Sequence, residues 1–199
     1  MKGEPLSYDV LYELYVKKQR SAAQVARQLG CSTNKVHYWL ARRGIPARSR
    51  SDATYVLHNP DGDPFTFKKP TCPEDWFLFG LGIGLYWGEG NKKNTTAVRL
   101  GNTDPKLVRT FLDFLIRIYA VKKEKIRFGL QVFSDMEPAR VLQFWSRELG
   151  YPKSHFGAVV VTPARSLGTY RTKSTYGVLT VYVSNKKLRD LLNREIERL

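Results

Sequence analysis

"WFLFGLGIGLYWGEGNK", residues 76–92, is an apolar stretch that contains five glycines and a single carboxylate, Glu89. Pro73, shortly before it, suits the first position of a helix, and the two acidic residues after Pro73 suit the positive end of a helix dipole. We therefore predict a helix from Pro73 to Glu89. Gly90 is expected to end this helix in a left-handed cap, a position that favours glycine.

Three of the glycines, Gly80, Gly84 and Gly88, recur every four residues and so lie on one face of the predicted helix. A face without side chains lets another backbone approach closely. Each glycine costs about 1 kcal/mol of helix propensity, which close packing has to offset. A buried core helix explains the apolar residues but not this alignment, and the G-x-G-x-x-G spacing of dinucleotide-binding loops is missing.

The whole chain of 199 residues is strongly basic, with 33 Lys and Arg against 18 Asp and Glu and a net charge of +15. Such a charge attracts polyanions, and we expect double-stranded DNA as the partner. A membrane surface or a ribosome is the alternative. The two cysteines lack zinc spacing, the N-terminus does not resemble a signal peptide, and the longest apolar run is shorter than the roughly 20 residues of a membrane span. We expect a cytoplasmic protein without a membrane partner.

Composition divides the chain into two domains joined by a linker. Residues 1–57 read as a helical DNA-binding domain and residues 73–199 as a larger domain of mixed helices and strands. The segment between them, 58–72, is rich in the turn formers proline, glycine and aspartate. Both domains carry an excess of basic residues, so both are candidates for contact with nucleic acid.

The first domain contains three predicted helices, the first from about Tyr8 to Lys18 and the others behind the capping residues Ser21 and Ser32. A turn at Gly30 between the last two gives the spacing of a helix-turn-helix, whose third helix enters the major groove. Between Glu13 and Asp52 the chain has nine basic residues and no acidic one. A three-helix packing module with a solvated basic face is the alternative.

The residues expected to contact DNA lie on the third helix and on an arm that follows it. They are Ser32, Thr33, Asn34, Lys35, His37, Tyr38, Arg42, Arg43, Arg48 and Arg50.

In the second domain, "GIGLYWGEG", residues 82–90, resembles the LAGLIDADG motif of homing endonucleases. Glu89 stands at the position of the metal-binding acid of that motif, and Trp87 replaces its other acid. The resemblance implies that Glu89 and Gly88 bind Mg²⁺. Because the chain has one such motif, two acids require two chains, which implies a homodimer through Gly80, Gly84 and Gly88 and a nearly palindromic DNA site.

The resemblance continues downstream and implies an α+β fold, in which the three-helix helix-turn-helix precedes a LAGLIDADG-like saddle of antiparallel strands backed by helices. The helix expected at 104–119 departs from the αββαββα order of the family. The predicted elements are strands at 97–104, 125–135, 155–161 and 176–184 and helices at 104–119, 137–150 and 185–198.

The resemblance also assigns roles to residues around the sheet. In the family, the sheet lies in the major groove, and a strand residue and a lysine assist the metal ions. Gln131 and Ser134 on a strand, and Lys186 or Lys187 at the start of the last helix, match those positions. A solvated basic sheet face is the alternative. The DNA contacts expected on this domain are Arg127, Lys153, Arg165, Arg171 and Lys173.

The sequence thus favours a dimeric, Mg²⁺-dependent, site-specific DNA endonuclease. A non-cleaving transcriptional regulator is the alternative, because the residues also look similar to sporulation regulators that join a degenerate LAGLIDADG fold to a helix-turn-helix. An RNA-binding or intron-splicing factor would keep the basic faces without needing Glu89.

Overall fold

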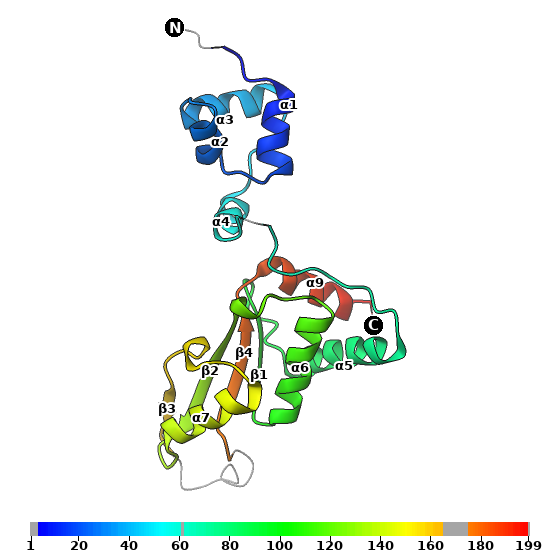
Figure 1. Cartoon of the computed structure of the whole chain (residues 1–199), viewed down its shortest axis with the longest axis vertical. Helices are drawn as coiled ribbons and strands as arrows, with labels where there is room; N and C mark the ends of the chain where they lie inside the picture. Colours follow the sequence, from blue (N-terminus) through cyan, green and yellow to red (C-terminus); the bar gives the residue numbers. More distant parts are fainter. Residues whose placement is uncertain (1–3, 61, 165–174, 199) are drawn as a thin grey trace. The chain divides into compact units, whose positions relative to one another are not determined.

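A computed structural model of the chain describes residues 4–60, 62–164 and 175–198 (Figure 1). The chain forms two compact units, Met1–Pro64 and Phe65–Leu199, and the division falls inside the segment predicted as a linker. Within the described residues, no helix is both long enough and apolar enough to cross a membrane.

The helices of the first unit begin where the sequence places capping residues. Ser21 and Ser32 accept hydrogen bonds from backbone amides in the first turns of their helices, and Gln24 Oε1 accepts one from the Ser21 amide. These caps confirm the predicted helix starts. The helical segments are α1 (Tyr8–Leu11) with its π-helical continuation η1 (Tyr12–Lys17), α2 (Ala22–Gln28) and α3 (Thr33–Arg42).

The core of the first unit is small and apolar. Leu11, Leu14, Val25 and Val36 are buried in it. Val10, beside Leu11 in the first helix, is 40% exposed and lines a shallow groove between that helix and the end of α2.

A fourth helix, α4 (Arg50–His58), follows where the sequence predicts an arm and an irregular linker. Ser49 caps it by accepting a hydrogen bond from the amide of Asp52. The arm prediction is therefore wrong from Arg50 onward, because Ser49 and Asp52 supply a helix-start signal that the surrounding basic residues obscure.

The second unit begins with the glycine-rich helix and contains one sheet. The predicted helix from Pro73 to Glu89 is confirmed at both ends. The strand predicted at 155–161 is largely wrong, since that segment forms a 3-10 turn followed by a strand of three residues. The elements are α5 (Pro73–Glu89), β1 (Val98–Asn102), α6 (Pro105–Arg117), η2 (Lys123–Lys125), β2 (Ile126–Phe133), α7 (Pro138–Leu149), η3 (Lys153–His155), β3 (Val160–Thr162), β4 (Val178–Val183) and α9 (Lys186–Ile196).

The four strands lie in the order β1-β4-β2-β3. β4 is antiparallel to both of its neighbours, but β3 pairs with β2 in parallel. The prediction of an antiparallel sheet is therefore wrong at this edge. The reason is that α7 connects β2 to β3 as a crossover, which returns the chain to the end of the sheet from which it started. The α+β class itself is confirmed.

Alternation along the strands separates the two faces of the sheet. One face carries buried residues such as Leu100, Phe128 and Val181, which join the apolar sides of α5, α6, α7 and α9 in one core. Figure 1 shows α6 and α7 running along this sheet. The residues between them point to the other face, here called the open sheet face, and are exposed or half-buried: Arg99, Gly101, Arg127, Gly129, Gln131, Val178, Thr180 and Tyr182.

α5 packs against α6 through a glycine that the sequence does not single out. A β-carbon on Gly82 would overlap the ring of Phe114, whereas one on Gly80, Gly84 or Gly88 would meet no described atom within 4 Å. The close approach of α5 to its own domain therefore takes place at Gly82. The other three glycines face outward.

Gly90 ends α5, but not in the predicted left-handed conformation. Its φ and ψ are −72° and 141°, and it forms a bridge to Leu100 of β1. A β-carbon there would overlap the carbonyl and ring of Tyr86. Glycine is needed at this position because the chain turns back against the last turn of α5.

Candidate functional site

α3 presents a polar, positively charged surface on the side away from its buried residues Val36 and Leu40. Tyr38 is 54% exposed, and the guanidinium of Arg42 lies 5.9 Å from its ring centroid. Lys35 is half-buried, and Ser32 is engaged in the helix cap. The other predicted contact residues on this helix, Thr33, Asn34 and His37, are exposed.

Two arginines predicted to contact DNA are instead engaged within the first unit. The guanidinium of Arg48 donates to the carbonyls of Tyr15 and Arg20 and stacks 4.0 Å above the Tyr15 ring. Arg43 donates to the Leu6 carbonyl and lies over the Trp39 ring. Both side chains stabilise the unit, so the candidate DNA surface is narrower than the sequence predicts.

The open sheet face of the second unit carries a row of two arginines around a tyrosine. Arg99, Tyr182 and Arg127 are register partners on β1, β4 and β2. The Arg99 guanidinium lies 5.8 Å from the Tyr182 ring centroid, and Arg127 folds onto the carbonyl of Glu124. Arg99 was not predicted, although its place between buried Val98 and Leu100 is a signal that the sequence contains.

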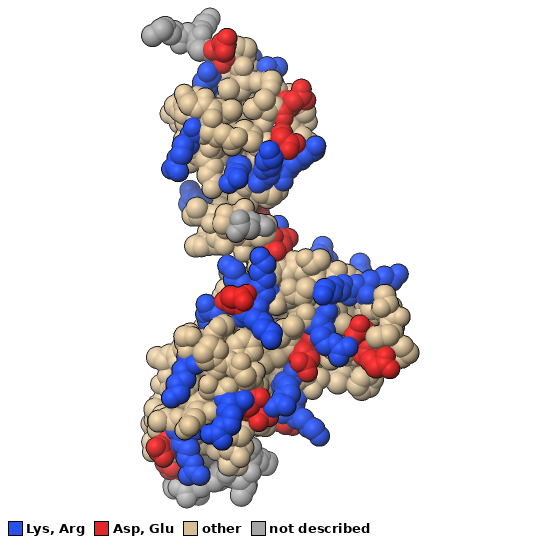
Figure 2. Space-filling model, viewed as in Figure 1, with Lys and Arg blue, Asp and Glu red and all other residues tan. Residues whose placement is uncertain are grey.

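The next row of the open sheet face is nearly free of side chains. Gly101 and Gly129 flank Thr180 in register. A flat strip beside cationic and aromatic groups allows a polynucleotide backbone to approach while the arginines meet its phosphates. Figure 2 shows Lys and Arg recurring over the drawn surfaces of both units.

Gln131 and Ser134, the predicted partners of Glu89, instead bond to β3 and to the residues after it, and Ser134 lies one residue beyond the end of β2 rather than on the strand. Gln131 Nε2 donates to Thr162 Oγ1 at 2.9 Å, and Ser134 Oγ accepts from the Ala164 amide at 2.9 Å. Gly90 bridges to β1, and β4 separates β1 from β2. With strands about 4.8 Å apart, this places Gln131 roughly 14 Å across the sheet from the end of α5. One chain does not bring these residues next to Glu89.

The structure describes some of the basic residues predicted near the sheet and not others. Lys153 is exposed at the start of η3. Lys186 and Lys187 are exposed in the first turn of α9, which Asn185 caps by accepting from the Leu188 amide. Arg165, Arg171 and Lys173 lie outside the described residues.

Glu89 is exposed at the last position of α5, where backbone carbonyls also accumulate. Lys92 Nζ donates to the Trp87 carbonyl, and the Gly90 amide donates to that of Tyr86. No described residue donates to the Gly88 carbonyl. A carboxylate and a carbonyl oxygen are hard donors of the kind that Mg²⁺ takes together with water and substrate phosphate. The donor set therefore fits Mg²⁺ as part of a shared site.

A second acid or histidine would have to come from elsewhere. Within the described part of the chain, no group of three or more His, Cys, Asp and Glu side chains is placed to hold a metal ion.

Arg189 of α9 is a candidate that the sequence prediction missed. Its guanidinium donates to the carbonyls of Lys92 and Asn94, in the loop that follows Glu89, and to the Asp190 carboxylate. It also lies near the buried hydroxyl of Tyr86: burial raises the pKa of Tyr86, and Arg189 opposes that rise. Nothing in the pattern of an amphipathic basic helix distinguishes Arg189 from its neighbours.

The outward face of α5 is apolar as well as rich in glycine. Phe77, Leu81 and Trp87 are 72%, 39% and 56% exposed, and they alternate with Gly80 and Gly84 along the helix. Large apolar side chains next to open glycines provide both the surface and the space that a second helix needs. We call this surface the glycine face.

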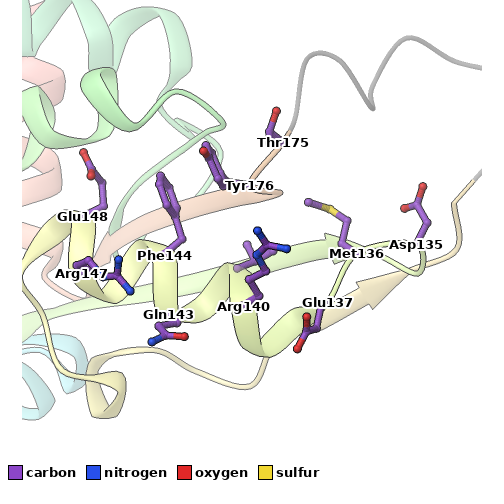
Figure 3. A pocket seen from close by; sticks show the side chains of 11 residues that line it. Asp135, Met136, Glu137, Arg140, Gln143, Phe144, Arg147, Glu148, Thr175 and Tyr176 are labelled. Atoms are coloured by element: carbon purple, nitrogen blue, oxygen red, sulfur yellow. The ribbon is translucent and has the colours of Figure 1, made fainter.

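A hollow of about 910 Å³ lies between α7 and the start of β4 (Figure 3). Phe144 and Tyr176, whose rings stack on each other with centroids 3.6 Å apart, line it together with Arg140 and Arg147. Its lining residues Thr175 and Tyr176 directly follow in sequence residues 165–174, which the structure does not describe, so we assign the hollow no ligand.

Comparison with known proteins identifies no relative of this chain. No model of a known protein family matches this chain, and neither a curated protein nor a solved structure matches it. The resemblance to LAGLIDADG enzymes therefore depends on residues 82–90 and on the order of the elements that follow.

Proposed function

We propose that the protein is a site-specific, double-stranded DNA endonuclease of LAGLIDADG type that acts as a Mg²⁺-dependent homodimer. The observation that carries the proposal is the position of Glu89, exposed at the end of a helix whose outward glycine face is free to pair. Pairing two copies through Gly80, Gly84 and Gly88 would bring two Glu89 carboxylates together, and acids that hold metal ions are one arrangement that hydrolyses a phosphodiester.

DNA is bound, in this proposal, by two surfaces. α2 and α3 act as a helix-turn-helix, in which Asn34 can pair with an adenine edge and Lys35 with a phosphate. The open sheet face supplies Arg99 and Arg127, and the start of α9 supplies Lys186, to the phosphates near the cut. Two-fold pairing then predicts a nearly palindromic site, with one half for each chain.

The Glu89 carboxylate and the Gly88 carbonyl of each chain would hold the metal. Bound Mg²⁺ lowers the pKa of a water molecule and stabilises charge on the leaving oxygen. The protein's own contribution is to hold these oxygens at the meeting point of two helices and to keep cations of the sheet and of α9 around the phosphate.

A non-cleaving transcriptional regulator is the second candidate. It is favoured by Trp87, which stands where the motif has its other acid and is 56% exposed. A regulator would use the same basic surfaces and would not need Glu89.

A cleavage assay distinguishes the nuclease from the regulator. The protein is incubated with randomised duplex DNA and with flanking genomic DNA, in Mg²⁺ or in EDTA. Double-strand cuts that require the metal would establish the nuclease. Specific binding without cuts in Mg²⁺, Mn²⁺ or Ca²⁺ would refute cleavage and leave the regulator.

Gly84→Leu is expected to break the dimer, since a leucine at the centre of the glycine face keeps two backbones apart. Sedimentation velocity should show a shift from dimer to monomer, with a dissociation constant raised at least about 100-fold, equivalent to about 2.7 kcal/mol. Asp113→Leu, which adds the same side chain on an exposed position of α6, should leave the dimer intact. A Gly84→Leu protein that stays dimeric would reject this interface.

The double substitution Arg99→Ala with Arg127→Ala is expected to weaken DNA binding and its dependence on salt. Each lost phosphate contact reduces the slope of log K against log salt by about 0.9, so a change of about 1.8 is expected per chain. Arg140→Ala with Arg147→Ala removes the same charge from the helical side of the sheet and is the control. Equal slopes for the two double variants would show that the open sheet face does not meet DNA.

A further inference from the structure

The loop from Asn91 to Ala97 connects the end of α5 to β1 and has hydrogen bonds of its own. The Asn94 Oδ1 accepts from the amides of Thr96 and Ala97, and the Asn91 amide donates to the Arg99 carbonyl. The bonds to Asn94 give the loop a shape, and the bond from Asn91 ties its first residue to β1. They do not tie its middle to the rest of the domain.

The middle of the loop is held by Arg189. Its Nε lies 3.0 Å from the Asn94 carbonyl and its Nη2 lies 2.9 Å from the Lys92 carbonyl, while Nη1 lies 2.9 Å from Asp190 Oδ1. The side chain is only 20% exposed, so these bonds are partly shielded from water. One planar guanidinium therefore fixes two loop carbonyls to α9.

The same loop begins two residues after Glu89, directly behind Gly90. Lys92, whose carbonyl Arg189 holds, also donates through Nζ to the Trp87 carbonyl in the last turn of α5. Arg189, Lys92 and Trp87 thus form a continuous connection from α9 to the turn that carries Glu89. If the middle of the loop is released, the last turn of α5 loses the group that closes its carbonyl end.

We propose that Arg189 is a positioning residue for Glu89, which fixes the direction of the carboxylate by locking the loop of residues 91–97 to α9. The role of the carboxylate rests on the proposed nuclease function, whereas the locking of the loop does not. Arginine is required because lysine is a point donor that cannot hold two carbonyls in one plane. Arg189→Met keeps the apolar stem and removes every donor, and Arg189→Lys should be intermediate.

Two measurements on the full chain test this. The first is hydrogen exchange, by NMR, of the amides of Asn91, Asn94, Thr96 and Ala97. The second is the Mn²⁺ concentration that half-broadens the amide signals of Gly88 and Gly90. Arg194→Met removes the same charge from the same helix and is the matched control, because Arg194 is exposed and makes no ion pair or hydrogen bond with the described residues.

Arg189→Met is expected to speed exchange in the loop and to raise the half-broadening Mn²⁺ concentration, each by about tenfold or more, as is usual for groups that orient metal ligands. Arg194→Met should match the wild type in both. Unchanged exchange in Arg189→Met would overturn the proposal. Faster exchange with unchanged Mn²⁺ response would also overturn it, since Arg189 would then stabilise the loop without positioning Glu89.

A different result would refute the metal role of Glu89 in the proposed nuclease. If the wild type shows no Mn²⁺ broadening at Gly88 and Gly90, the metal role of Glu89 is refuted, and with it the positioning role. The exchange measurement then still decides whether Arg189 locks the loop.

Discussion

Glu89→Gln is expected to abolish DNA cleavage and to leave DNA affinity within about twofold. The amide has the size of the carboxylate but no charge, so it binds Mg²⁺ far more weakly than the carboxylate does. Cleavage should fall by at least about 10³-fold, since even groups that only orient metal ligands are worth 10–100-fold. Glu89 is exposed and makes no hydrogen bond or ion pair with the described residues, so folding does not depend on it.

Stability should even rise slightly. A negative charge at a helix C-terminus opposes the helix dipole, and its removal is worth about 0.3–1 kcal/mol. A loss of activity in this variant therefore cannot be explained by unfolding.

The cleavage rate under single-turnover conditions and the binding constant in Ca²⁺ are the measurements. Glu74→Gln, at the other end of the same helix, is exposed and serves as control. If the wild type cuts and Glu89→Gln cuts equally fast, the acid is not a metal ligand and the resemblance to LAGLIDADG enzymes is misplaced at this position.

Gly82→Ala is expected to destabilise the second unit by about 3 kcal/mol or more, at the upper end of what an added methyl group costs in a packed core. The new β-carbon would overlap the ring of Phe114, which is fully buried among Phe111, Tyr119 and Phe79 and cannot move without displacing them. The two helices would have to separate along their length.

Gly84→Ala is the matched variant, two residues further along the same helix. Its β-carbon meets no described atom of the same chain within 4 Å, and alanine improves the helix propensity of the monomer by about 1 kcal/mol. Urea unfolding of the monomer, at protein concentrations low enough to dissociate the dimer and followed by near-UV circular dichroism, should therefore give a lower free energy of unfolding than the wild type for Gly82→Ala and a higher one for Gly84→Ala. If Gly82→Ala is as stable as Gly84→Ala, α5 does not pack on α6 as described.

Sequence signals were sufficient to predict those features whose physical cause lies within a few residues. Pro73 and the acidic residues after it marked the start of α5, and Ser21 and Ser32 marked α2 and α3, because a helix start depends on groups within one turn of the cap. Charge and alternation likewise indicated basic surfaces and a half-covered sheet. Glu89 stood out as the only acid in an apolar run.

Other features depend on contacts between distant segments, and for these the sequence was misleading or silent. Gly90 is a glycine because the ring of Tyr86 lies against it, not because its φ is positive. In the sequence Arg48 resembles a DNA contact, but in the structure its guanidinium binds Tyr15, which lies 33 positions earlier in the chain. The parallel pairing of β3 could have been inferred from the helix that precedes it, but its short strand gave little signal.

By itself, the sequence determined the two-part organisation, the basic character of both parts, the limits of α5 and the position of its terminal acid. Tertiary structure decided which glycine packs inward and which arginines remain exposed for contact with DNA. It also decided that Arg189 holds the loop after Glu89. The physical reason is the same in each case: capping, charge and periodicity act over a few residues, whereas close packing and hydrogen bonds to loop carbonyls depend on residues brought together from as far apart as Lys92 and Arg189.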